Sequence, residues 1–212
     1  MLRLVSLLAL LSTSGFGQFI SVGVKGGVPL TDAYSTVSSG LLSATAYNRR
    51  YVVGPTAELH LPFHLSFEVD ALYRRNGFDY SAPPSQFFTG FSSRTKVNDW
   101  EIPLLGKYTL GAGPFRPFLD AGLTYRHVSI ADFIGISGAT KATTPFVPLD
   151  NPSIAGFTLG GGLTLKLLLI RVSPEIRYTH WGSQAFQGLT RTSTTPLSST
   201  TDQADFLVGL TF

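Results

Sequence analysis

Hydrophobic side chains recur at every second position in eight segments of this chain, and this period constrains the fold more than any other feature. A period of two places successive side chains on opposite faces of a β-strand. Beyond the first residues, no segment has the apolar spacing of a helix. The sequence therefore predicts an all-β protein. The eight predicted strands are 20–28, 51–59, 65–73, 100–108, 119–125, 157–167, 172–178 and 206–212.

The opposite face of these strands carries charge. Six acids and seven bases alternate there with the apolar residues, a near balance that predicts mutual ion pairing. These thirteen residues are Lys25, Glu58, Glu68, Asp70, Arg74, Glu101, Lys107, Asp120, Arg126, Lys166, Arg171, Glu175 and Arg177.

Connection lengths indicate which face points outward. A soluble barrel buries its apolar face and a membrane barrel exposes it, so alternation alone leaves both open. Here short turns near 62–64, 111–114 and 168–170 alternate with long polar loops at 31–50, 77–99, 129–153 and 182–202. Outer-membrane barrels have this asymmetry, with short periplasmic turns and long extracellular loops. We therefore predict an eight-stranded antiparallel up-and-down transmembrane β-barrel, with bulges or shortened strands at Pro55, Pro103, Pro117 and Pro174.

Aromatic residues on the apolar face support a membrane setting. Five of them stand at the loop end of their strands, where they would form an interfacial girdle: Tyr51, Tyr73, Trp100, Tyr125 and Tyr178. Tyr108 and the terminal Phe212 mark the turn end. We expect outer-membrane lipids to surround the barrel between these two levels.

Residues 1–17 combine a basic Arg3, the apolar run 4–11 and small residues before Gln18. This pattern predicts a cleaved signal peptide, followed by a barrel domain at 18–212. With no Cys, disulfides and thiolate chemistry are excluded, and a formal charge of +3 without a basic stripe argues against nucleic-acid binding.

The stretch WEIPLLGKYTL at 100–110, followed by PFRPFLDAGLTYRHV at 114–128, resembles the outer-membrane protein β-barrel domain family of small OmpA-like and PorT-like barrels. GVKGG at 23–27, SPEIRY at 173–178 and FLVGLTF at 206–212 extend the resemblance. It implies an integral protein of the Gram-negative outer membrane. It also implies that the last strand, ending at Phe212, is the signal read by the barrel-assembly machinery. The family has no shared catalytic residues.

Few residues suggest chemistry. His127 and Ser129 share a face, and H-x-S at a lipid-facing rim resembles the lipid A deacylase barrels, but a hydrolase also needs a carboxylate to orient the His. His60 and His64 are too few for a zinc site. We expect no catalytic, cofactor or metal site.

The leading interpretation is a non-enzymatic outer-membrane platform whose lumen is closed by ion pairs and whose four loops meet an extracellular ligand of unknown identity. Candidate contact residues are Phe87, Phe88, Phe91 and the segment 191–201. A narrow channel for small solutes or ions is one alternative, and a hydrolase using His127 and Ser129 is another. A soluble barrel would instead place Phe157, Leu163 and Leu165 around a hydrophobic ligand.

Overall fold

The computed structural model describes residues 19–32, 34–36, 43–48, 51–82, 91–111, 113–137, 140–142, 152–167, 169–183 and 197–212. The predicted signal peptide lies outside the described residues. Among the described residues no helix is long and apolar enough to cross a membrane.

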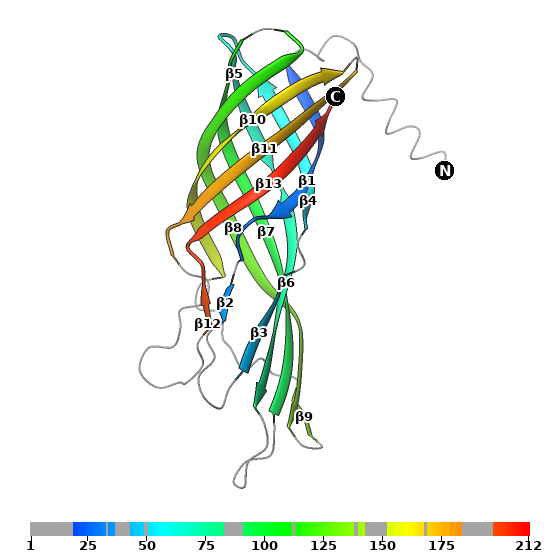
Figure 1. The fold of residues 1–212 in the computed structure, drawn as a ribbon, viewed down its shortest axis with the longest axis vertical. Helices are drawn as coiled ribbons and strands as arrows, with labels where there is room; N and C mark the ends of the chain where they lie inside the picture. Colours follow the sequence, from blue (N-terminus) through cyan, green and yellow to red (C-terminus); the bar gives the residue numbers. More distant parts are fainter. Residues whose placement is uncertain are drawn as a thin grey trace, which may run out of the picture.

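Eight antiparallel strand positions, which we call staves, close into a barrel (Figure 1). Seven staves are single strands, and one consists of β5 and β6 in succession, separated at Ala71. They are β1 (Ile20–Pro29), β4 (Val52–His60), β5 (Leu65–Asp70) with β6 (Leu72–Ala82), β7 (Phe91–Thr109), β8 (Phe115–Ser137), β10 (Ser153–Leu167), β11 (Ile170–Trp181) and β13 (Asp202–Thr211). Each pairs with its neighbour in this order, and β13 returns to β1. The predicted eight-stranded barrel is confirmed.

The seam between the first and last strands is tight. Gly23 faces Thr211 and Gly27 faces Leu207 in the β1–β13 ladder. A Cβ on Gly23 would lie 1.9 Å from the carbonyl oxygen of Leu210, and one on Gly27 would lie 2.0 Å from that of Phe206. No larger residue fits without displacing the backbone of β13, so these two glycines permit closure.

The outer wall is apolar and exposed on every stave. Representative outward side chains have 38–63% of their surface exposed, and they are Val24, Val53, Phe67, Leu104, Leu123, Leu159, Ile176 and Phe206. Soluble proteins rarely expose so large a continuous apolar surface. Phe157 is also outward, at 49% exposure, so the soluble barrel that would have gathered it around a ligand is wrong. The barrel spans a membrane.

Three strands continue past the barrel, where long loops were predicted. β6 runs to Ala82, β7 starts at Phe91 and β8 ends at Ser137, and they pair with one another along this length. β3 (Ser43–Asn48) pairs with β6 and β9 (Thr140–Ala142) pairs with β8. We call this five-stranded sheet the extension (Figure 1, lower part). The loop prediction was wrong for the ends of β6 and β7, because a strand beyond the lipid needs no regular apolar face and its residues can be as polar as those of a loop. For 129–153 the sequence left a short extra strand open, since Ile130, Phe133, Ile134 and Ile136 are apolar, and β8 continues through them to Ser137.

The strand prolines disturb the barrel less than predicted. Pro55 lies opposite the interruption at Ala71, whose amide still donates to the carbonyl of Pro55 at 3.0 Å. Pro103 and Pro117 remain in register within their ladders, and Pro174 does so opposite Val208 of β13. On its other side, the β10–β11 ladder is interrupted between Glu175 and Val172, where Pro174 lies. The shift in the β7–β8 register falls instead between Lys96 and Val97. A proline removes a ladder bond only where its nitrogen would have donated, and its carbonyl still accepts.

The membrane setting predicts a depth-dependent effect of charge on stability. Leu104 lies midway along β7 between the girdle residues Trp100 and Tyr108, and its side chain points outward. Leu104→Arg should lower the free energy of unfolding by about 2–4 kcal/mol, as measured by denaturant titration in lipid vesicles. The matched control Leu110→Arg, beyond Tyr108, should cost only about 0–1 kcal/mol. Equal costs would contradict a lipid-facing wall.

Candidate functional site

The lumen is the most heavily charged part of the described structure. Alternation along each stave turns the charged side chains inward, and twelve are buried, seven of them carboxylates and five cations. They are Lys25, Glu68, Asp70, Arg74, Asp99, Glu101, Lys107, Asp120, Arg126, Glu175, Arg177 and Asp205. Burial of so many charges is stable only if most are paired.

One group of ion pairs lies in the half of the lumen nearer the turns, and we call it the turn-side cluster. Lys25 Nζ lies 2.5 Å from Glu68 Oε1 and 3.1 Å from Glu175 Oε2. Arg177 contacts the same carboxylates, Glu68 at 2.9 Å and Glu175 at 2.6 Å, and Asp70 at 2.8 Å. Lys107 pairs with Glu68 and lies 4.5 Å from the centre of the Phe118 ring.

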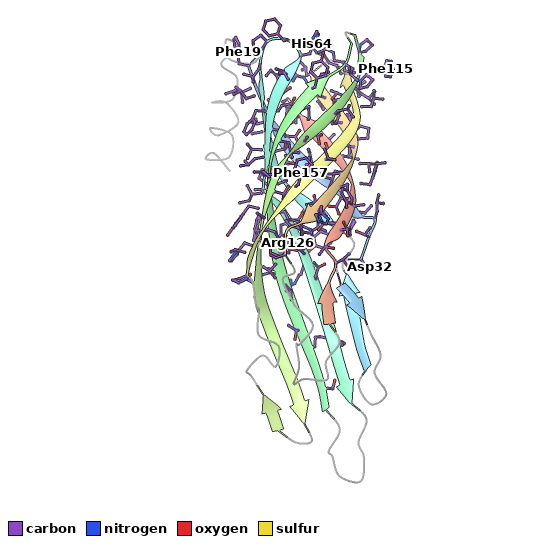
Figure 2. The ribbon with its side chains drawn as sticks, turned by 90° about the vertical axis from the view of Figure 1, so that its left-hand side faces the viewer. Phe19, Asp32, His64, Phe115, Arg126 and Phe157 are labelled. Atoms are coloured by element: carbon purple, nitrogen blue, oxygen red, sulfur yellow. The ribbon has the colours of Figure 1, made fainter. Side chains whose placement is uncertain are left out.

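A second group, the loop-side cluster, lies nearer the extension. Arg74 Nη2 is 2.8 Å from Glu101 Oε2 and 3.0 Å from Asp205 Oδ2. Arg126 pairs with Asp99, and its guanidinium stacks 5.1 Å from the Trp181 ring. Arg126 is labelled in Figure 2, near the level at which the barrel gives way to the extension.

The two clusters connect opposite walls. In the ring of eight staves, β5 and β11 are diametrically opposed, and Arg177 of β11 reaches Asp70 and Glu68 of β5. β7 and β13 are also opposed, and Gln203 of β13 donates to Glu101 of β7 at 3.2 Å. An eight-stranded barrel has only enough interior for side chains, so contacts across its diameter fill the lumen at two depths.

The sequence analysis missed several lumen residues, among them Asp99, Phe118, Trp181, Gln203 and Asp205. Asp205 precedes the outward Phe206, so the alternation of inward and outward side chains along the strand could by itself have assigned it to the lumen. Asp99 is in phase with Glu101 in the same way, but it was assigned to a loop. Trp181 is 2% exposed and donates from Nε1 to Gln203 Oε1 at 3.2 Å.

The predicted charge balance was wrong in the buried lumen. Lys166 is exposed and Arg171 half-buried at the turn end, outside the two clusters, while Glu58 is half-buried and 3.4 Å from Lys107. Arg171 donates to the hydroxyl of Ser21 at 2.7 Å rather than to a carboxylate. Lys166 and Arg171 are therefore not among the buried lumen residues, whereas Asp99 and Asp205 are. As a result, buried carboxylates outnumber buried cations by two among the described residues.

Asp120 carries part of this excess. It is buried, yet neither carboxylate oxygen has a hydrogen-bond partner within the described part of the chain. Its carboxylate packs against Gly160 of β10, where an added Cβ would come within 2.2 Å of Oδ1. The neighbouring lumen positions carry threonine hydroxyls instead of charged groups. Thr158 Oγ1 lies 2.5 Å from Thr124 Oγ1 and 2.9 Å from Thr179 Oγ1.

The predicted girdle residues lie on the outer wall or beside it. Trp100, Tyr125 and Tyr178 are exposed at the loop end, and Tyr108 is exposed at the turn end. Tyr73 is half-buried because its ring lies 5.1 Å from that of Trp100. Tyr51 is half-buried immediately before β4.

The predicted hydrolase residues do not form a triad. His127 Nδ1 lies 3.2 Å from Ser153 Oγ, on the neighbouring β10, and not in a hydrogen bond with Ser129. No described carboxylate pairs with His127. The described His–Asp pair at this rim is His180 with Asp202, at 2.8 Å, and the hydroxyl of Tyr178 shares that carboxylate. Among the described side chains, no three His, Asp or Glu residues are arranged to hold a metal ion.

Solved outer-membrane barrels resemble this chain. The outer membrane protein OprG from Pseudomonas aeruginosa aligns at a TM-score of 0.55 and 14% identity, covering 92% of this chain and 94% of OprG. Neisserial surface protein A aligns at a TM-score of 0.47 and 12% identity, covering 91% of this chain and 95% of its own. No family model and no curated protein matches the sequence. The likeness to OprG shows the outer-membrane barrel fold, and the PorT-like resemblance stays a prediction.

The pairing of Arg177 predicts a large loss of stability on its removal. Arg177→Met leaves Glu68, Asp70 and Glu175 short of one cation, and should lower the free energy of unfolding by about 3–5 kcal/mol. The control is Arg94→Met, which breaks the exposed pair with Asp79 in the extension and should cost less than about 1 kcal/mol. Denaturant titration in micelles measures both, and similar costs would contradict a buried network.

Asp120 and Asp70 predict opposite effects of the same isosteric change. Asp120→Asn removes a buried charge without a partner and should raise the free energy of unfolding by about 1 kcal/mol. Asp70→Asn deprives Lys25 and Arg177 of a partner and should lower it by about 3 kcal/mol. A destabilised Asp120→Asn variant would show that this carboxylate has a stabilising contact.

Proposed function

We propose that this protein is a non-enzymatic integral protein of the bacterial outer membrane, in which a closed barrel supports the extension outside the cell. The observation that carries the proposal is the filling of the lumen from opposite walls by Arg177 with Asp70 and by Gln203 with Glu101. Such a barrel is a rigid support rather than a wide pore.

The extension supplies a contact surface. β7 begins nine residues before Trp100 and β8 continues twelve residues beyond Tyr125. At about 3.3 Å per residue, these segments run about 30 and 40 Å along the strands from the girdle. Exposed sheet edges are a common surface for partner binding, so we place the extracellular ligand here.

The contact residues expected from the sequence fall in different places. Phe87 and Phe88 lie outside the described residues, and Phe91 is the first residue of β7. Residues 191–196 also lie outside, while β12 (Leu197–Ser199) pairs with β2 (Tyr34–Thr36) beyond the loop end of the barrel (Figure 1). In this proposal outer-membrane lipids surround the apolar wall. The barrel-assembly machinery reads the last strand, which ends at Thr211, together with the exposed Phe212 that follows it.

A deletion tests the platform. Asn76 and Val97 are direct partners in the β6–β7 ladder, so an Asn-Gly turn joining them can replace residues 77–96. The shortened protein should remain in the outer membrane and still shift in gel mobility on boiling, as the full-length control does. Loss of that shift would mean that the barrel depends on the extension and would overturn the platform proposal.

A narrow cation channel is the second candidate, favoured by the excess of buried carboxylates and by the unpaired Asp120. Planar-bilayer recording separates the two functions. The platform predicts no stable conductance steps in concentrated KCl, and steadier currents only after Arg177 and Gln203 are both changed to Ala. Cation-selective steps in the unaltered protein would favour the channel.

A further inference from the structure

The turn end of the barrel holds a cavity that the proposed function does not use. Its volume is about 240 Å³, and residues at the turn ends of seven staves form its walls. At about 30 Å³ per molecule of liquid water, it has room for roughly eight waters. We call it the vestibule. His64, at the rim, lies at this end of the molecule (Figure 2).

Cations dominate the vestibule. Arg116, Lys166 and Arg171 line it together with His60 and His64, whereas Glu58 is the one acid in its described lining. That acid is already engaged, at 3.4 Å from Lys107 and 3.5 Å from His60 Nδ1. The vestibule therefore carries a net positive charge.

The three permanent cations lack anionic partners among the described residues. Arg116 Nε donates to the carbonyl oxygen of Gly113 at 2.8 Å. Arg171 donates from Nη1 to the hydroxyl of Ser21 at 2.7 Å and to Nε2 of the neighbouring His60, both of which are neutral acceptors. Lys166 is exposed. This differs from the lumen below, where every buried cation meets a carboxylate. Guanidinium groups are suited to bidentate binding of oxyanions, and a free ammonium adds a point charge.

Neutral donors complete the lining. Hydroxyl groups project into the vestibule from several strands, and they belong to Ser66, Thr109, Thr164, Ser173 and Thr211. A ring of hydroxyls with three cations can satisfy many acceptor oxygens on one small ligand. A tetrahedral oxyanion offers several acceptor oxygens to such a lining, whereas a hydrophobic ligand would leave Arg116, Lys166 and Arg171 without a counter-charge. Thr164 and Ser173 already share one hydrogen bond, at 3.2 Å.

The turn that presents His64 is unusual. Phe63 and His64 have φ values of 64° and 62°, the left-handed conformation of a tight hairpin turn. Such positions favour Asn and Gly, and side chains with a Cβ are strained there. The chain instead places an imidazole at the edge of the vestibule, where it adds a further donor.

We propose that the vestibule binds a phosphate group from the periplasmic side of the membrane. Below it, the turn-side cluster fills the lumen and the buried carboxylates are in excess, so an anion is held at the mouth and does not pass through. The ligand is either free phosphate or the phosphate of a small ester that fits the cavity. A membrane lipid is a poorer fit, because the hydroxyl and cationic residues of the lining lie on the lumen face of their strands, and only Leu61 and Leu65 of the lining are exposed apolar residues.

Calorimetric titration of the folded protein in nonionic detergent with inorganic phosphate tests this. The unaltered protein should bind phosphate. The double variant Lys166→Gln with Arg171→Gln should bind at least about tenfold more weakly, because two charge-assisted contacts are lost. The matched control Arg75→Gln with Arg94→Gln removes two cations from β6 and β7 and should bind as the unaltered protein does. Equal weakening in both double variants, or no binding to the unaltered protein at millimolar phosphate, would overturn the proposal.

Two further measurements keep the result interpretable. Lys166→Gln alone changes an exposed side chain, so it should fold, shift on boiling and still show weaker phosphate binding. An unchanged affinity in this folded variant counts against the site. Titration with glycerol phosphate then distinguishes the ligand sources: binding tighter than that of phosphate indicates an ester, and weaker binding indicates the free ion.

Discussion

The structure depends on the pairing of its first strand with its last. Within lipid no water is present to satisfy backbone amides and carbonyls, so a sheet can span a membrane only if it has no free edge. The β1–β13 ladder removes that edge, and Gly23 and Gly27 allow the two backbones to approach. Once the sheet is closed, the apolar side chains of each stave must face lipid and the charged ones must share one narrow interior.

That interior explains the energetics of the lumen. A charge with no partner would be costly there, so eleven of the twelve buried charged residues, all but Asp120, gather into the turn-side and loop-side clusters. Aromatic rings fill the space beside the cations, as Phe118 does for Lys107 and Trp181 for Arg126. Cross-lumen contacts between opposite staves make the barrel resist both collapse and opening.

The period of two was enough to predict the fold, because lipid on one side and charge on the other impose strict alternation. The same alternation placed most of the lumen residues on the inward face. It failed where lipid ends. β6, β7 and β8 continue past that level without a regular alternation of apolar and polar residues, and Asp99 at the boundary was assigned to a predicted loop. Lys166 and Arg171 lie at the mouth because of their depth along the barrel axis, which is set by how near each residue is to the turn that ends its strand. Periodicity carries no such depth information.

The unequal distribution of charge between the mouth and the interior has an electrical consequence. Cations are fixed at the turn end and surplus carboxylates are fixed deeper in the barrel, so the folded molecule has a permanent dipole along the membrane normal. A voltage across the membrane acts on such a dipole with a sign that depends on insertion direction. Two populations inserted in opposite directions are therefore electrically distinct, even if neither conducts a single ion.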